Sequence, residues 1–164
     1  MKPNEERDIP LSERKSGSTF GFTDVDGKLT TLDSLKGKVV VVAFFSTSCE
    51  PSMRQLLDVA QLQPKGAQFG FEIIPAHLES WVNIGQMTRK WADVKPVRFY
   101  RAGLGEHGPL QLGPELSALP TVFVLDRQGK VAHVYVGFME NKLSGVLRRY
   151  LAEKPAADVP AAQP

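Results

Sequence analysis

The chain contains a single cysteine, Cys49, among its 164 residues. One thiol excludes an internal disulfide, and it excludes a multi-cysteine zinc site or an iron–sulfur cluster bound by this chain alone. The three histidines, His77, His107 and His133, are scattered without the spacing of metal ligands. The sequence therefore predicts no metal site and no bound cofactor.

Strong net charge and long apolar runs are also missing. Twenty basic and eighteen acidic side chains leave a net charge of +2, too close to neutral to predict nucleic acid or anionic lipid as the main partner. No apolar run reaches membrane-spanning length, and the polar residues 1–7 lack the apolar stretch of a secretory signal. Two interpretations stay open: a cytoplasmic chain, or a mature fragment behind a new methionine.

The composition that is present is that of one ordinary globular domain, with 42% hydrophobic, 9% aromatic and 23% charged residues. Residues 1–17 are charged and lack periodicity, and residues 154–164 are rich in Ala and Pro, so both segments are expected to be disordered. The sequence predicts a single folded domain at 18–153.

Hydrophobic periodicity predicts an alternation of strands and helices within that domain. The segment 20–30 is typical of a hairpin that turns at Asp26-Gly27, and the apolar run 39–45 is typical of a strand buried on both faces. The other expected elements are a helix from Pro51 to a stop at 64–66, a strand at 69–78, a helix at 81–91 capped by Ser80, a short strand at 95–99, an antiparallel strand pair at 121–125 and 130–136, and a C-terminal helix at 143–151. Such alternation predicts an α/β fold with parallel strands.

Cys49 lies in the short loop between the apolar strand and the helix that starts near Pro51. Proline is well tolerated in the first turn of a helix, where its missing N–H would have no partner. The thiol therefore faces unpaired backbone N–H groups, which together with the helix dipole favour thiolate over thiol. We expect a nucleophile that reacts near neutral pH; the competing interpretation is an inert, buried thiol.

Three weaker patterns indicate other sites. The glycines at 103–108 match a dinucleotide-binding spacing, but no strong strand precedes them and no periodic helix follows. Asp24 and Asp26 resemble the start of a calcium loop whose remaining ligands are absent. Met53, one helical turn after Cys49, would suit Cu(I) beside a thiolate, but it also fits the apolar face of the helix, and core packing is favoured.

Five blocks of sequence, at 22–28, 35–40, 44–51, 119–126 and 128–131, together resemble the TlpA/ResA-like thioredoxin family, and the likeness runs from residue 18 to 152. The resemblance implies a thioredoxin-like fold: a central mixed β-sheet flanked by helices, with an N-terminal β-hairpin. It also implies a thiol-disulfide oxidoreductase outside the cytoplasm, with a role in cytochrome c maturation for many members. In the family a C-x-P-C motif opens a helix and faces a cis-proline.

The chain departs from this pattern where the family does its chemistry. Ser52 stands at the second cysteine of C-x-P-C, Ser48 replaces the usual tryptophan, and Gln55 stands where many relatives carry a functional glutamate. A serine cannot break a mixed disulfide, so the two-cysteine cycle cannot run, although a hydroxyl can hydrogen-bond the thiolate. Two explanations stay open, an engineered replacement of a native cysteine or a native monothiol branch, and the changes at 48 and 55 favour the second.

The resemblance implies protein thiols and disulfides as partners, joined through a mixed disulfide, with an upstream membrane reductant as a further partner. Pro120 is expected to be cis and to pack over the cysteine, so that the backbone at Leu119 pairs with an extended substrate strand. The expected catalytic residues are Cys49 and Ser52, and the expected substrate-binding residues are Glu50, Pro51, Leu119 and Pro120. Two other functions stay open: a redox-silent module that binds an extended segment in the same groove, and a copper-delivery protein.

Overall fold

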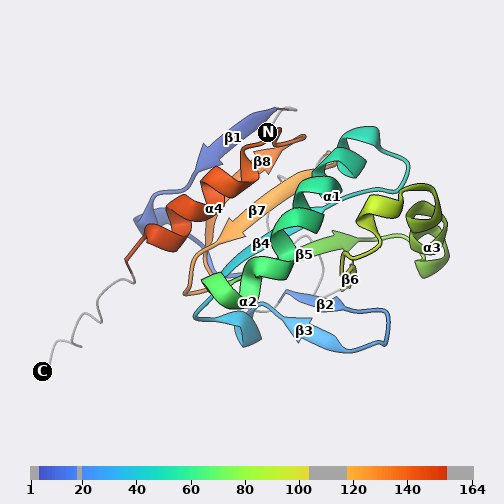
Figure 1. Ribbon diagram of the computed structural model, residues 1–164. Coiled ribbons are helices and arrows are strands. Elements are labelled where there is room, and N and C mark those ends of the chain that lie inside the picture. The colour runs from blue at the N-terminus through green and yellow to red at the C-terminus, as the bar shows by residue number, and fades with distance from the viewer. Residues whose placement is uncertain (1–3, 18–19, 104–117, 155–164) are drawn as a thin grey trace, which may run out of the picture.

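The computed structural model describes residues 4–17, 20–103 and 118–154. Its centre is a mixed sheet with the strand order β1-β8-β7-β4-β5-β6-β2-β3. The strands are β1 (Glu5–Asp8), β2 (Gly21–Thr23), β3 (Leu29–Thr31), β4 (Val39–Phe44), β5 (Phe71–His77), β6 (Tyr100–Ala102), β7 (Thr121–Leu125) and β8 (Val131–Val136). The longer helices are α1 (Glu50–Leu62), α3 (Trp81–Lys90) and α4 (Leu143–Ala152), and α2 (Gly66–Phe69) is a single turn. Figure 1 shows α1, α2 and α4 across one face of the sheet.

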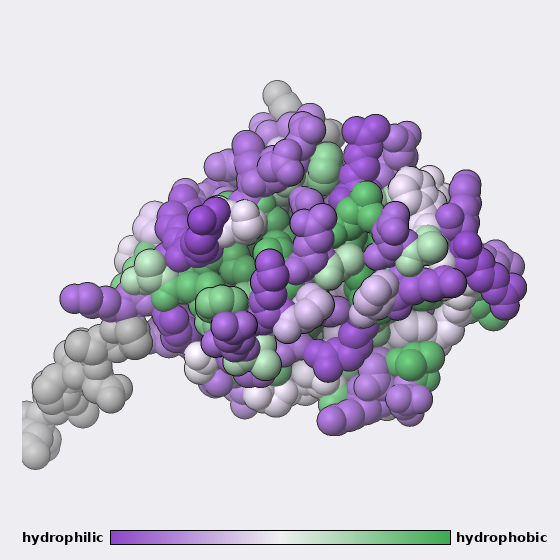
Figure 2. All heavy atoms as spheres, in the orientation of Figure 1, coloured by the Kyte–Doolittle hydropathy of each residue, from purple (hydrophilic) through white to green (hydrophobic). Residues whose placement is uncertain are grey.

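The central strand β4 has a hydrophobic core on each of its faces. Val39, Val41 and Ala43 belong to the core that α1, α3 and α4 cover. The alternate residues, Val40, Val42 and Phe44, belong to a second core with Phe20, Phe22 and Phe123. The expectation of a strand buried on both faces is therefore confirmed, and the α/β fold with a mixed sheet is confirmed with it. Figure 2 shows hydrophilic side chains over most of the helical face, with hydrophobic ones visible mainly between α1 and α4.

The predicted hairpin is present as β2 and β3, whose turn places Gly27 at φ +81°. β4 and β5 run parallel, and β7 and β8 run antiparallel, as the sequence predicts. Ser80 caps α3 by accepting a hydrogen bond from the backbone N–H of Asn83 at 3.3 Å. Within the part of the chain that the structure describes, no helix has both the length and the apolar character needed to cross a bilayer.

Of two predicted boundaries, the stop of the helix is close to the observed one, and the position of the short strand is wrong. α1 ends at Leu62, just before Pro64; a 3-10 turn (Gln63–Lys65) and the single turn α2 follow, and the chain leaves α2 at Gly70 with φ +75°. Pro64 is tolerated because it lies in the first turn of that 3-10 segment, where its missing N–H needs no partner. The short strand is not at 95–99 but at Tyr100–Ala102, after the proline-containing segment, and it pairs with β5 and β2.

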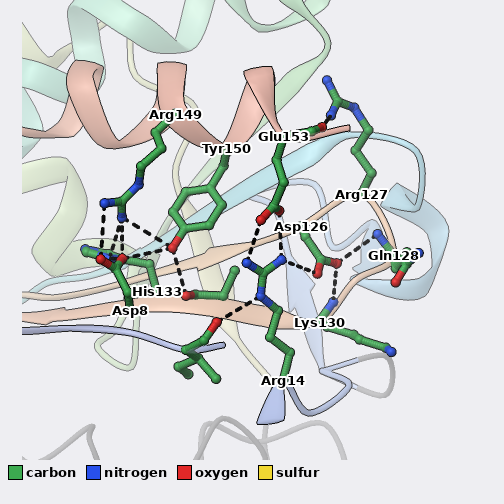
Figure 3. A network of polar contacts seen from close by, with 12 residues as sticks. Asp8, Arg14, Asp126, Arg127, Gln128, Lys130, His133, Arg149, Tyr150 and Glu153 are labelled. Carbon is green, nitrogen blue, oxygen red and sulfur yellow. Dashed lines mark hydrogen bonds and ion pairs between the residues drawn. The ribbon is translucent and has the colours of Figure 1, made fainter. Parts of the chain in front are cut away.

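The expected disorder of residues 1–17 is wrong for the described residues 4–17. β1 pairs antiparallel with β8 at the edge of the sheet, although all four of its side chains are exposed and charged. Figure 3 shows the reason, a polar network that fixes this segment on β8 and α4. Asp8 accepts from Arg149 and lies 2.7 Å from Nδ1 of His133. Charges far apart in the sequence therefore order a segment that has few apolar side chains of its own.

Arg14 extends this network, and only 6% of its side chain is exposed. Its guanidinium donates to Asp126 at 3.0 Å and to both carboxylate oxygens of Glu153 at 2.7 Å. Of the Ala/Pro-rich tail, only Lys154 lies within the described residues, so the expected disorder of the tail falls outside them. The glycine pattern after Gly103 and His107 also lie outside the described residues.

Candidate active site

The loop after β4 places Cys49 at the start of α1. Cys49 is the N-cap residue of the helix, with extended backbone angles (φ −105°, ψ 113°). Its backbone N–H donates to the carbonyl of Ser46 at 3.3 Å, and its carbonyl accepts from Met53 N–H at 3.1 Å. The half-buried thiol therefore stands at the positive end of a 13-residue helix, where an anion is favoured.

The backbone carbonyl of Leu119 lies beside this thiol, although Leu119 is 70 residues away in the chain. The Sγ atom of Cys49 is 3.6 Å from the carbonyl oxygen of Leu119. The two segments meet because β4 and β7 are neighbours, with Phe44 opposite Thr121. The Leu119–Pro120 peptide bond is cis. Pro120 is buried, whereas 39% of Leu119 is exposed beside the sulfur.

Ser52 lies one turn into α1 and is fully buried. Its hydroxyl oxygen accepts a hydrogen bond from the backbone N–H of Ser46 at 3.3 Å. The side chain at the position of the missing cysteine therefore supports the turn that leads to Cys49. Direct hydrogen bonding between this hydroxyl and the thiolate stays a prediction.

Glu50 and Pro51, the two residues between Cys49 and Ser52, are exposed at the start of α1. Glu50 forms an ion pair with Arg54 at 2.7 Å, one turn along the helix. The structure therefore brings Cys49 to Leu119, the residue before Pro120, while Glu50 and Pro51 follow Cys49 on the exposed first turn of α1 and Ser52 is buried in the same turn.

Glu79 was not identified from the sequence, and it holds the loop that carries the thiol. Its carboxylate accepts from the backbone N–H of Thr47 at 2.7 Å and also from the Thr47 hydroxyl, and Asn83 donates to it at 3.2 Å. Burial opposes ionisation of this carboxyl group, but the hydrogen bonds from Thr47 and Asn83 outweigh it and hold its pKa below the usual value. Glu79 is therefore a carboxylate at neutral pH.

His77 is the second residue that sequence reasoning missed as part of this site. It ends β5, is fully buried, and contacts the rings of Phe45 and Trp81 with centroid distances of 5.8 and 4.7 Å. Burial lowers the pKa of His77 to about 4, so its imidazole is neutral near pH 7. Its Nδ1 atom lies 3.1 Å from the backbone carbonyl of Glu79, to which a neutral ring donates when that nitrogen carries the proton.

Gln55 and Met53 pack inside the molecule on α1. The side-chain oxygen of Gln55 accepts from the backbone N–H of Met139 at 3.0 Å, which ties α1 to the segment after β8. Met53 is buried in the core under the helices, consistent with the packing role that the sequence favours. Among the described residues, no group of three or more His, Cys, Asp or Glu side chains is placed to hold a metal ion.

This arrangement can support nucleophilic sulfur chemistry. The thiol stands at the N-terminus of α1, and it donates to the Leu119 carbonyl, which lies beside it on an exposed edge. The loop 46–49 is fixed from two sides. Ser52 holds it from α1, and Glu79 holds it from the β5–α3 bend, which is the segment 78–80 between β5 and α3.

Comparisons with known proteins identify the family of the chain. The family model described as Redoxin matches residues 13–148. The thiol-disulfide oxidoreductase ResA of Bacillus cereus is 31% identical over 137 residues, which cover 82% of this chain and 76% of ResA. ResA of Bacillus subtilis (strain 168) is 28% identical over 134 residues, with 81% of this chain and 72% of ResA covered.

Solved structures show the same fold. A thiol:disulfide interchange protein of the thioredoxin family from Chlorobium tepidum TLS superposes with a TM-score of 0.70 at 24% identity, covering 88% of this chain and 99% of its own. The resemblance to the TlpA/ResA-like thioredoxin proteins is thereby confirmed, and the chain belongs to the Redoxin family.

Proposed function

We propose that the protein carries out thiol-disulfide exchange on protein substrates through the single thiol of Cys49. The observation that supports this most directly is the position of that thiol, at the N-terminus of α1 and 3.6 Å from the carbonyl of Leu119. The helix dipole suits an attacking group that carries negative charge, and the backbone at Leu119 offers an edge that an extended substrate could pair with.

The first step is an exchange without net oxidation. The Cys49 thiolate attacks one sulfur of a substrate disulfide, the new S–S bond forms as the old one breaks, and the second substrate sulfur leaves as a thiolate. In the second step another thiol attacks the mixed disulfide. If a further cysteine of the same substrate attacks the substrate sulfur, Cys49 leaves as a thiolate and the substrate disulfide is rearranged. If an external thiol attacks the Cys49 sulfur instead, the substrate leaves with both of its cysteines reduced; a second external thiol then attacks the new mixed disulfide, Cys49 leaves as a thiolate, and the two external thiols end as a disulfide.

Ser52 makes the second step depend on a thiol from outside the chain. The hydroxyl is buried and engaged with Ser46 N–H, and a hydroxyl cannot form a disulfide. The proposal therefore includes an external reductant as a partner. By the resemblance to TlpA/ResA-like proteins, we extend it to a reductant held in the membrane, to a location outside the cytoplasm and to cytochrome c maturation.

The reaction of Cys49 with an aromatic disulfide, dithiobis-nitrobenzoate, tests the proposal. Each attack forms a mixed disulfide on Cys49 and releases one coloured thiolate. We expect one equivalent of thiolate per chain, released near pH 7 faster than by free cysteine, and reversal of the adduct by glutathione. Cys49→Ser should release none. A wild-type rate no greater than that of free cysteine would falsify the proposal.

A redox-silent binding module is the second candidate function, and the serine at position 52 favours it. A model peptide that carries a disulfide, and the same peptide with serines in place of its cysteines, separate the two functions. Thiol-disulfide exchange predicts a reducible adduct with the disulfide peptide alone, which Cys49→Ala abolishes. The binding module predicts equal affinity for both peptides and no effect of Cys49→Ala.

A further inference from the structure

We propose that His77 is a positioning residue for Cys49, because its buried imidazole fixes the β5–α3 bend, which in turn holds the loop that presents the thiol. The expected effect of His77 on the reaction rate of Cys49 rests on the proposed function. The structural part, the ordering of the loop, can be tested separately from that function.

The imidazole of His77 contacts the backbone of the β5–α3 bend directly. His77 is the last residue of β5, and its Nδ1 atom lies 3.1 Å from the carbonyl oxygen of Glu79, two residues later. A donated Nδ1–H fixes the direction in which the chain leaves the strand. Burial between the rings of Phe45 and Trp81 keeps the imidazole in one place.

The β5–α3 bend in turn contacts the loop 46–49, which carries the thiol and is called the thiol loop below. The side chain of Glu79 accepts two hydrogen bonds from Thr47, one from its backbone N–H and one from its hydroxyl. Thr47 lies two residues before Cys49. The two strands are also joined at this point, since Phe45 N–H donates to the carbonyl of Ala76 at 3.1 Å. A shift of the Glu79 backbone therefore moves the anchor of the loop 46–49.

Packing alone does not account for a histidine at this position. Its Nε2 atom is buried and has no hydrogen-bond partner among the described residues. An unpaired buried acceptor lowers stability, whereas an apolar side chain of similar size would fill the same space without that penalty. The feature that an apolar side chain could not supply is the Nδ1–H donor toward Glu79.

His133 provides a matched control in the same molecule. It is also fully buried, and its Nε2 atom also has no partner among the described residues. Its Nδ1 atom, however, lies 2.7 Å from Asp8 in the network that holds the N-terminal segment. Figure 3 shows that residue among the contacts of β8 and α4. Replacement of His133 therefore disturbs a buried histidine without touching the thiol loop.

The experiment compares His77→Phe, His77→Asn and His133→Phe in the full chain. His77→Phe keeps a ring between Phe45 and Trp81 but loses the donor, whereas the amide nitrogen of asparagine replaces Nδ1–H. We expect His77→Phe to slow the reaction of Cys49 with dithiobis-nitrobenzoate roughly tenfold near pH 7, because small misplacements of reacting groups have large effects on rate. His77→Asn and His133→Phe should stay within about twofold of wild type.

Hydrogen exchange at the Thr47 amide is the second measurement, and it does not depend on thiol chemistry. We expect faster exchange in His77→Phe and wild-type exchange in His77→Asn and His133→Phe. If His77→Phe does not fold, His77→Leu replaces it with the same expectations. A folded His77→Phe or His77→Leu chain with wild-type exchange at Thr47 overturns the inference, as does an equal loss in His133→Phe. Altered exchange at Thr47 in a protein whose thiol is no more reactive than free cysteine would instead refute only the proposed function.

Discussion

The backbone N–H of Gly137 donates to the carbonyl of Pro120 at 2.7 Å, so the end of β8 supports the loop beside Cys49. Gly137 has φ +109°, and a Cβ atom at this position would lie 2.7 Å from the side-chain oxygen of Asn4 and 3.1 Å from its backbone nitrogen. Asn4 in turn donates to the carbonyl of Val136 at 2.6 Å. One glycine therefore connects the N-terminal segment with the loop that contacts the thiol.

Gly137→Ala is predicted to lower the free energy of unfolding by roughly 1 to 3 kcal/mol, because an alanine is strained at positive φ and its methyl group meets Asn4. Urea unfolding measures this change. The variant should also alter the rate at which Cys49 reacts, since relief of the strain shifts the backbone N–H that donates to Pro120. Gly145→Ala in α4, where a Cβ meets nothing within 4 Å, is the control and should be neutral or stabilising. Equal stabilities of the two variants would contradict the prediction.

Ser52→Ala is predicted to destabilise the protein by about 1 to 2 kcal/mol, because the backbone N–H of Ser46 loses its buried acceptor. The turn before Cys49 should also loosen, which hydrogen exchange at the Ser46 amide measures. The exposed Ser12→Ala serves as the control and should leave both quantities unchanged. Unchanged exchange at Ser46 in Ser52→Ala would show that the hydroxyl does not support the turn.

Local pattern was sufficient to predict the strand, the thiol loop and the start of the helix. The apolar run of β4, the polar residues after it and Pro51 are neighbours in sequence, so their structure follows from short-range rules. Glu79 and His77 were missed because the hydrogen bonds of Glu79 with Thr47 and the ring contact of His77 with Phe45 join segments about 30 residues apart, and neither residue belongs to a recognisable motif. The signal that could have found them is their place at the carboxyl end of β5, the strand parallel to β4. Functional side chains of α/β folds gather at the carboxyl ends of parallel strands.

The N-terminal segment was misjudged for a related physical reason. Disorder was predicted from its charged composition, on the argument that such a segment cannot bury enough apolar surface. Arg14 and Asp8 instead find partners on β8, α4 and the residues flanking them, which only the tertiary structure brings together. Composition measures what a segment can bury by itself and not which charges the rest of the chain supplies.

Arg14→Leu is predicted to lower the free energy of unfolding by about 3 kcal/mol, because it leaves the buried carboxylate of Asp126 without its cation. Lys36→Gln is the matched control: it breaks an exposed ion pair with Asp33 and should cost no more than about 1 kcal/mol. Urea unfolding of both variants measures the difference. Arg14→Leu should leave the reaction rate of Cys49 unchanged, and an equally small effect of both substitutions on stability would contradict a structural role for Arg14.

Stability in mild acid is predicted to depend on His77. Burial lowers the pKa of His77 to about 4 in the folded protein, against an ordinary value of 6.5. Between these two values the unfolded chain binds a proton that the folded protein does not, so the free energy of unfolding falls as the pH decreases. Each pH unit in this window removes up to about 1.4 kcal/mol, and the fall from about pH 7.5 to 4.5 amounts to roughly 2 to 3 kcal/mol.

The contribution of the Glu79 carboxylate to the free energy of unfolding is lost at a lower pH than the contribution of His77. The effects of the two residues can therefore be measured separately. Hydrogen bonds lower the pKa of Glu79, so its stabilising contribution is complete above the ordinary value of 4.5 and is lost only as the pH falls further, through the folded-state pKa. Urea unfolding of the wild type, His77→Asn and Glu79→Gln between about pH 7.5 and 4.5 tests the assignment. We expect His77→Asn to flatten the pH dependence in this range and Glu79→Gln to preserve it. If His77→Asn and the wild type lose stability in parallel as the pH falls, His77 is not the group that titrates.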